Sequence, residues 1–224
     1  MTISQSVSVL PISLTPETRV VLLDIEGTTT PVSFVYETLF PFARARLSEY
    51  ISTSDAAALF AEYQCESTSG IPEWQGNADD LSSAAHYAEW LMSVDRKSTA
   101  LKELQGRIWE RGYASGELKG IVYDDVPMVF ESWKRQGIPV AIFSSGSVLA
   151  QKLIFSHTQY GDLTKFIAAN FDTRTGPKRE AASYRRIAAE MKVPCASVTF
   201  FSDTEAEITA SDEAGMTSVL VVRG

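Results

Sequence analysis

The sequence predicts an α/β protein with a doubly wound parallel sheet and an inserted all-helical segment. Four short β-branched runs are almost continuously apolar, which is typical of strands buried on both faces of a parallel sheet. Helical patterns alternate with these runs in the second half of the chain. The long interval after the first run has no comparable run and spaces its apolar residues mostly by three and four.

The elements of the α/β part are predicted from these patterns in chain order. Strands are expected at residues 19–24, 139–143, 197–202 and 218–222. Helices are expected at residues 124–136, 148–157, 178–191 and 204–214. The first of these helices places Val126, Val129, Phe130 and Trp133 on one stripe, and Gly137 follows its end, where glycine commonly stops a helix.

The helical segment is predicted to be an insert, or cap domain, of residues 33–120. Residues 1–32 and 121–224 then form the α/β core, and 224 residues are enough for two hydrophobic cores. No internal repeat or low-complexity tract interrupts either part.

Two helices of the insert have recognisable ends. A helix over residues 98–113 carries an apolar face, and we expect it to end at Gly112 and Gly116. Another helix is expected to begin at a cap residue, either Asn77 or Asp79.

Composition excludes several classes of protein. Apolar residues make up 45% of the chain and charged residues 21%, as in folded soluble proteins. The net charge of -8, from 28 acids against 20 Lys and Arg, disfavours binding to nucleic-acid phosphates. No window reaches the length of a membrane span, and the first residues lack the basic and apolar regions of a signal peptide. Cys65 and Cys195 are expected to be reduced and buried, and the expected location is the cytoplasm.

Two acids end the first predicted strand. Asp24 is the last residue of that strand and Glu26 follows after one spacer. In parallel α/β sheets, ligands bind beyond the carboxyl ends of the strands. Asp24 by itself is equally well explained as a cap of the following turn. Glu26 weakens that explanation, because two adjacent carboxylates repel each other unless a cation or a substrate separates their roles.

Three further segments carry candidate residues. Ser144 and Ser145 follow the second strand and open a helix, where hydroxyl and backbone N–H groups bind phosphate oxygens. Lys178 lies in a Gly-Pro loop before the next helix, and Asp203 ends the third strand with two more acids after it. Asp24 and Asp203 together would suit Mg²⁺, which prefers carboxylate and water oxygens.

Each of these residues also has an ordinary structural explanation. The Ser-Gly cluster is a common turn, a single lysine is usually on the surface, and Asp203 could cap a helix. The order acid-x-acid, Ser, Lys, acid is much more specific than any one member, because three of the four groups follow strands that feed separate loops.

Three longer segments extend this pattern: DIEGTTTPVSFV at 24–35, LQGRIW at 104–109, and SSGSV with AQKL within 144–153. In its motif order the chain resembles the haloacid dehalogenase superfamily, and in these segments it resembles the bifunctional enolase-phosphatases of methionine salvage. Glu26 is the most diagnostic residue, because most phosphatases of the superfamily have Asp there. The resemblance implies a Rossmann-like core with a helical cap inserted after the first motif.

The resemblance also implies roles for the matching residues. Asp24 would attack phosphorus and form an aspartyl-phosphate, and Glu26 would act as the acid and base. One Mg²⁺ per subunit would be held by Asp24, Asp203 and the main-chain carbonyl of Glu26. Ser144, Ser145 and Lys178 would hold the phosphoryl oxygens; these three side chains complete the expected site.

The substrate implied by the resemblance is 2,3-diketo-5-methylthiopentyl 1-phosphate. It would be enolised and then dephosphorylated to the acireductone 1,2-dihydroxy-3-keto-5-methylthiopentene. The enolisation base stays open between Glu26 and a cap residue such as Glu73 or Glu89. The alternative is a phosphatase of the same superfamily that acts on another small phosphomonoester. A monomer is expected, with no nucleic-acid or membrane partner.

Overall fold

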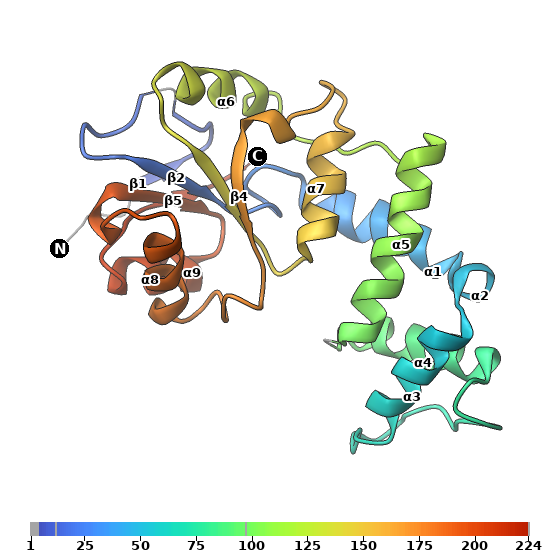
Figure 1. Ribbon diagram of the computed structural model, residues 1–224. Coiled ribbons are helices and arrows are strands. Elements are labelled where there is room, and N and C mark those ends of the chain that lie inside the picture. The colour runs from blue at the N-terminus through green and yellow to red at the C-terminus, as the bar shows by residue number, and fades with distance from the viewer. Residues whose placement is uncertain (1–4, 12, 97, 224) are drawn as a thin grey trace. The chain divides into compact units, whose positions relative to one another are not determined.

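The computed structural model describes residues 5–11, 13–96 and 98–223 (Figure 1). The chain divides into two compact units, one of Met1–Val35 with Lys119–Gly224 and one of Tyr36–Leu118. We call them the sheet unit and the helical unit. The prediction that residues 33–120 form a separate domain stays a prediction.

The sheet unit contains one parallel sheet. Within the described residues it has six strands, in the order β1-β6-β5-β2-β3-β4, and every neighbouring pair is parallel. The strands are β1 (Gln5–Val7), β2 (Val20–Leu23), β3 (Val140–Phe143), β4 (Ile167–Phe171), β5 (Val198–Ser202) and β6 (Thr217–Val221). All residues of β2, β3 and β5 are buried, as continuous apolar runs predict.

Helices cover both faces of this sheet (Figure 1). They are α6 (Val126–Arg135), α7 (Val148–Ser156), α8 (Ala181–Glu190) and α9 (Glu205–Glu213), with short 3-10 turns at Thr164–Phe166 and Cys195–Ser197. On one face the Trp133 ring of α6 stacks on Phe201. On the other face Tyr184 of α8 packs edge-on against Phe143 and Phe200. The doubly wound α/β fold is therefore confirmed.

Two strands of the sheet were not predicted. Strand β4 has the sequence IAANF, in which only Phe171 is buried, and it pairs with β3 alone. Strand β1 pairs with β6 alone through a register that includes Val7 opposite Val221. Both lie at the edges of the sheet, where one neighbour supplies the hydrogen bonds and little apolar pattern is needed.

The helical unit is helical, as predicted for the insert. Its helices are α1 (Phe40–Arg44), α2 (Leu47–Tyr50), α3 (Thr53–Tyr63), α4 (Leu81–Ser93) and α5 (Thr99–Ser115), preceded by a π-helix at Phe34–Leu39. The two helices predicted individually are α4 and α5, each with a correction at one end. Neither Asn77 nor Asp79 caps α4; Asp80 does, accepting the Ser83 N–H at 2.6 Å. Gly112 does not end α5. It lies inside the helix, where an added Cβ would come 2.5 Å from the ring of Phe42, and α5 ends instead at Gly116 with φ +79°.

The cysteines are unpaired, but the prediction that they are buried is wrong. Cys65 is exposed and Cys195 is partly exposed. Cys65 lies in the turn after α3, whereas Cys195 begins the 3-10 helix Cys195–Ser197 and packs against the edge of the core. Among the described residues, no helix combines the length and the apolar character needed to cross a membrane.

Candidate active site

The strand order brings three of the predicted residues together at the carboxyl ends of the inner strands. Strand β2 lies between β5 and β3, so that Leu23 pairs with both Phe201 and Ile142. The chain continues from β2 to β3 and β4 on one side of β2 and then crosses to β5 and β6 on the other side. Ligands of doubly wound folds bind at such a switch point. Asp24, Ser144 and Asp203 directly follow these three strands.

Asp24 begins a tight turn of residues 25–30. Its carboxylate is 3% exposed and accepts the N–H of Ile25 at 2.7 Å. The N–H groups of the three threonines, 28 to 30, all point to the carbonyl of Ile25. Gly27 has φ +69°, and a Cβ there would lie 2.0 Å from Oδ2 of Asp203. Only glycine therefore lets this turn and the end of β5 approach so closely.

Lys178 lies against Asp24 rather than on the surface. Its Nζ is 2.6 Å from Oδ1 of Asp24 and 2.6 Å from Oε2 of Glu207, and its side chain is 10% exposed. The loop that presents it is held from α8, because Tyr184 donates its hydroxyl to the carbonyl of Lys178 at 2.7 Å. A lysine ammonium has three N–H donors, so these two carboxylates leave one for a phosphoryl oxygen.

Glu207 is a member of the site to which the sequence analysis assigned no role. It lies in the first turn of α9, is 8% exposed, and shares Lys178 with Asp24. The hydroxyl of Ser202 lies 2.9 Å from Oε2 of Glu207 and 3.1 Å from Oδ2 of Asp24. Its signal in the sequence is weak, because Asp203, Glu205 and Glu207 are similar acids at alternate positions.

Glu26 and Ser144 contact each other beyond the carboxyl ends of β2 and β3. The Ser144 hydroxyl donates to Oε2 of Glu26 at 3.3 Å and accepts the N–H of Gly146 at 3.1 Å. Ser144 is 1% exposed, whereas the neighbouring Ser145 is exposed. The turn leads into α7, whose N-cap is Ser147, so the backbone N–H groups of a helix start face this region. The Ser-Gly segment can therefore be both a turn and a binding site for phosphate oxygens.

The electrostatics of the site follow from many acids around one lysine. Burial, and next the charge of Asp24, raises the pKa of Glu26, and the same two causes raise the pKa of Glu207 to about 7. The partial removal of Asp203 from water, and next the charge of Asp24, raises the pKa of Asp203 as well. Burial would lower the pKa of Lys178, but the charges of Asp24 and Glu207 outweigh it and raise the pKa.

The Ser202 hydroxyl shows how this charge can be accommodated. A hydroxyl has one proton, so it can donate to only one of two ionised carboxylates at a time. A protonated Glu207 would donate to Ser202, which could then donate to Asp24. The raised pKa of Glu207 fits this arrangement.

The donor set suits a hard divalent cation. The carboxylates of Asp24 and Asp203 and the main-chain carbonyl of Glu26 are oxygen donors of the kind Mg²⁺ prefers. In the described part of the chain, no three His, Cys, Asp or Glu side chains form a metal cluster. Mg²⁺ does not need one, since it usually takes one or two carboxylates and keeps several waters. The raised pKa of Asp203 shows negative charge that such a cation would compensate.

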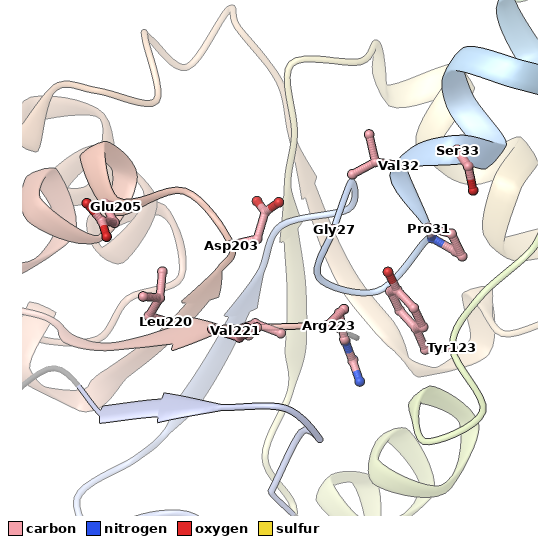
Figure 2. A pocket seen from close by; sticks show the side chains of 11 residues that line it. Gly27, Pro31, Val32, Ser33, Tyr123, Asp203, Glu205, Leu220, Val221 and Arg223 are labelled. Carbon is pink, nitrogen blue, oxygen red and sulfur yellow. The ribbon is translucent and has the colours of Figure 1, made fainter.

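An open cavity of about 670 Å³ lies beside Asp203, within the sheet unit (Figure 2). The turn after β2 and the end of β6 form its walls. Its lining residues are Gly27, Pro31, Val32, Ser33, Tyr123, Asp203, Glu205, Leu220, Val221, Val222 and Arg223. Asp203 thus has its carboxylate next to space that a hydrated ion can enter.

Comparison with known proteins places these features in a family. The model of the haloacid dehalogenase-like hydrolases matches residues 18–215. The chain is 48% identical to the enolase-phosphatase E1 of Synechococcus elongatus, over 96% of this chain and 91% of that protein. It is 44% identical to the enolase-phosphatase E1 of Drosophila mojavensis, over 92% of this chain and 85% of that protein. Among solved structures, the UTR4 protein of Saccharomyces cerevisiae matches with a TM-score of 0.73 and 32% identity, over 92% of this chain and 90% of that one.

Proposed function

The chain belongs to the enolase-phosphatase E1 family of haloacid dehalogenase-like hydrolases, and we propose that it converts 2,3-diketo-5-methylthiopentyl 1-phosphate to the acireductone and phosphate in methionine salvage. It is a phosphoric monoester hydrolase with enolase activity. The observation that carries the chemistry is the buried Asp24 carboxylate, held by Lys178 at 2.6 Å between the ends of β5 and β3.

Asp24 is the nucleophile of the phosphatase step in this proposal. One carboxylate oxygen bonds to phosphorus while the bond from phosphorus to the substrate's C1 oxygen breaks, giving an aspartyl-phosphate. Water then attacks phosphorus, the phosphorus bond to Asp24 breaks, and phosphate leaves. Ser144, the turn at Ser145 and the third N–H of Lys178 hold the phosphoryl oxygens as charge moves between them.

Glu26 is the acid and base of the same step. Burial raises its pKa, which favours the protonated carboxyl group over the carboxylate, and its proton goes to the leaving C1 oxygen. The carboxylate so formed then takes a proton from the attacking water. Before a phosphoryl group binds, the Ser144 hydroxyl, 3.3 Å from Oε2, holds the Glu26 carboxyl group beside Asp24 and Ser144.

The proposed cofactor is one Mg²⁺, held by Asp24, Asp203 and the main-chain carbonyl of Glu26. When bound, it supplies positive charge that lets a carboxylate approach an anionic phosphate. Gly27 keeps Asp203 close to the other two ligands, because its missing Cβ leaves room for the Asp203 carboxylate. We further propose a cytoplasmic monomer.

The enolisation base stays open between two parts of the chain. Glu26 lies in the site, whereas Glu73 and Glu89 are exposed on the helical unit. Three single variants, Glu26→Gln, Glu73→Gln and Glu89→Gln, separate them: the variant of the base loses the ultraviolet signal of the enol. A variant that keeps this signal but loses phosphate release affects the phosphatase step only.

The test of the proposal follows enol absorbance and free phosphate together, with the diketo phosphate and Mg²⁺ as the only additions. Wild type should produce both, and Asp24→Asn should release no phosphate while keeping the fold. Phosphate release without an enol signal would favour the second candidate, a phosphatase for another small phosphomonoester. Continued phosphate release by Asp24→Asn would overturn the nucleophile assignment.

A further inference from the structure

Arg223 follows the last strand and has its guanidinium inside the sheet unit (Figure 2). Its side chain is 9% exposed. Nε and Nη2 donate to the carbonyl of Thr28 at 3.1 and 2.6 Å, and Nη1 donates to Oδ2 of Asp125 at 2.9 Å and to the carbonyl of Ser8 at 3.1 Å. The guanidinium also lies 4.2 Å from the centre of the Tyr123 ring. One arginine therefore joins four segments that are distant in the sequence.

The contact with Thr28 is the one that concerns the reaction. Thr28 is fully buried and lies in the turn of residues 25–30, directly after the proposed nucleophile. The N–H groups of this turn are used within the turn, whereas the Thr28 carbonyl points outward to Arg223. A buried carbonyl without a donor destabilises the conformation that leaves it so, and the arginine therefore favours this one conformation of the turn.

The same arginine lies where both connections to the helical unit reach the sheet. Thr29, which precedes that unit in the chain, accepts the N–H of Tyr123, which follows it, at 3.0 Å. Arg223 stacks on Tyr123 and pairs with Asp125, and Asp125 also accepts the N–H of Leu10 at 2.7 Å. The turn is thereby tied to the segment of residues 123–125 and not only to β2.

We propose that Arg223 is a positioning residue of the active site, which holds the turn of residues 25–30 so that Asp24 and the Glu26 carbonyl face Asp203. The proposal rests on the proposed function for the roles of those three residues. A direct role with substrate is disfavoured, since four of the five guanidinium N–H groups already have acceptors.

The experiment uses Arg223→Ala and Arg223→Lys in the full chain. The matched control is Arg185→Ala, which removes an exposed arginine that donates to a backbone carbonyl, that of Glu213, at 2.7 Å. Hydrogen exchange is measured without metal for peptides covering residues 25–31, and kcat and KM are measured on the folded fraction. For Arg223→Ala we expect faster exchange in that segment and a kcat lower by about 10²-fold with little change in KM, because small misplacements of reacting groups have effects of that size.

Two further readouts separate positioning from general stability. Guanidinium ion at low concentration should restore part of the kcat of Arg223→Ala, whereas methylammonium should not, since it lacks the paired N–H groups that face Thr28. Arg223→Lys keeps the charge opposite Asp125 but loses those paired donors, so it should also show faster exchange and reduced kcat. If Arg223→Ala fails to fold, Arg223→Lys alone tests whether Arg223 positions the turn.

The proposal is overturned if both Arg223 variants match Arg185→Ala in exchange of the 25–31 segment or in kcat. Failure of the proposed function is a different result. In that case Asp24→Asn keeps releasing phosphate, while the exchange measurement on the metal-free protein still reports whether Arg223 holds the turn.

Discussion

Carboxylates of the helical unit and carboxylates at the carboxyl edge of the sheet are held in opposite ways. In the helical unit, Asp55 closes a capping box with Ser52 and pairs with Arg107. Burial would raise its pKa, but the Ser52 hydrogen bonds and the Arg107 charge outweigh burial and lower it. At the sheet edge, burial and the Asp24 charge raise the pKa of both Glu26 and Glu207.

The difference shows which carboxylates stabilise the fold. An acid with a lowered pKa is stabilised as an anion by folding, whereas an acid with a raised pKa opposes folding once it ionises. In the helical unit, Asp55 is stabilised by the hydrogen bonds of a helix cap and by an arginine. At the carboxyl edge of the sheet, Asp24 and Glu207 share Lys178, so the site retains negative charge that a metal ion can compensate. The predictions below test this contrast, from the largest expected effect to the smallest.

Removing the shared cation should have the largest effect. Lys178→Met removes the positive charge that Asp24 and Glu207 share, and we expect the free energy of unfolding at pH 8 to fall by about 3 kcal/mol, as for other broken buried pairs. Phosphate release should fall by about 10²–10³-fold, because a donor to the phosphoryl oxygens is lost. Urea denaturation and a phosphate assay measure the two effects.

The matched control lies in the helical unit. Arg107→Met breaks the pair with Asp55, in which the arginine is 45% exposed, and should cost no more than about 1 kcal/mol. Equal losses of stability in the two variants would remove the contrast between the regions.

Mg²⁺ should stabilise the sheet edge by compensating its charge. At about 100 times its dissociation constant, an ion that binds only the folded state adds about 3 kcal/mol to the free energy of unfolding. Asp203→Asn should lose this gain, whereas Glu205→Gln should keep it, although both residues line the same cavity. Thermal unfolding with Mg²⁺ or EDTA gives the comparison, and an identical Mg²⁺ response in Asp203→Asn would exclude Asp203 as a ligand.

The two regions should respond to pH with opposite sign. Glu207 has an ordinary pKa near 4.5 and a folded-state pKa of about 7, so folding binds its proton more tightly. The free energy of unfolding should therefore fall as pH rises from 4.5 to 7, on the order of 1–3 kcal/mol from this group. Glu207→Gln should make that decline shallower, which denaturation curves across this range will show; an unchanged slope speaks against the shifted group.

Asp55 gives the opposite slope. Its lowered pKa adds stability that is present above the ordinary value of 3.8 and is lost as pH falls through the lower folded-state pKa. Asp55→Asn should thus destabilise the protein most at pH 6, and its effect should shrink as pH falls further below 3.8. Equal destabilisation at pH 6 and below pH 3.8 would mean that Asp55 acts through packing and not through its charge.

A helix cap should give the smallest effect. Ser52 accepts the N–H of Asp55 at 3.3 Å at the start of α3, and Ser52→Ala should cost about 1 kcal/mol. Its phosphate release per folded molecule should equal that of wild type, as measured at a temperature well below unfolding. A large drop in turnover would show that the helical unit contributes to the reaction through this helix.

Much of the fold and part of the candidate site could be predicted because they leave local patterns. The four inner strands are continuous apolar runs, and Asp24, Ser144 and Asp203 stand directly after three of them. Glu207 was less visible, since Asp203, Glu205 and Glu207 look alike in the sequence. The way α9 packs on the sheet buries Glu207 and leaves Glu205 exposed.

The sequence by itself determined the fold class, the inserted helical segment and the order of the motifs, because burial on both faces and helical spacing are recorded residue by residue. Only the tertiary structure decided the edge strands, the placing of β2 between β5 and β3, and the sharing of Lys178 between Asp24 and Glu207. It alone showed that Arg223 reaches the Thr28 carbonyl, 195 residues earlier in the chain. Such contacts depend on how distant segments pack, and no local pattern contains that information.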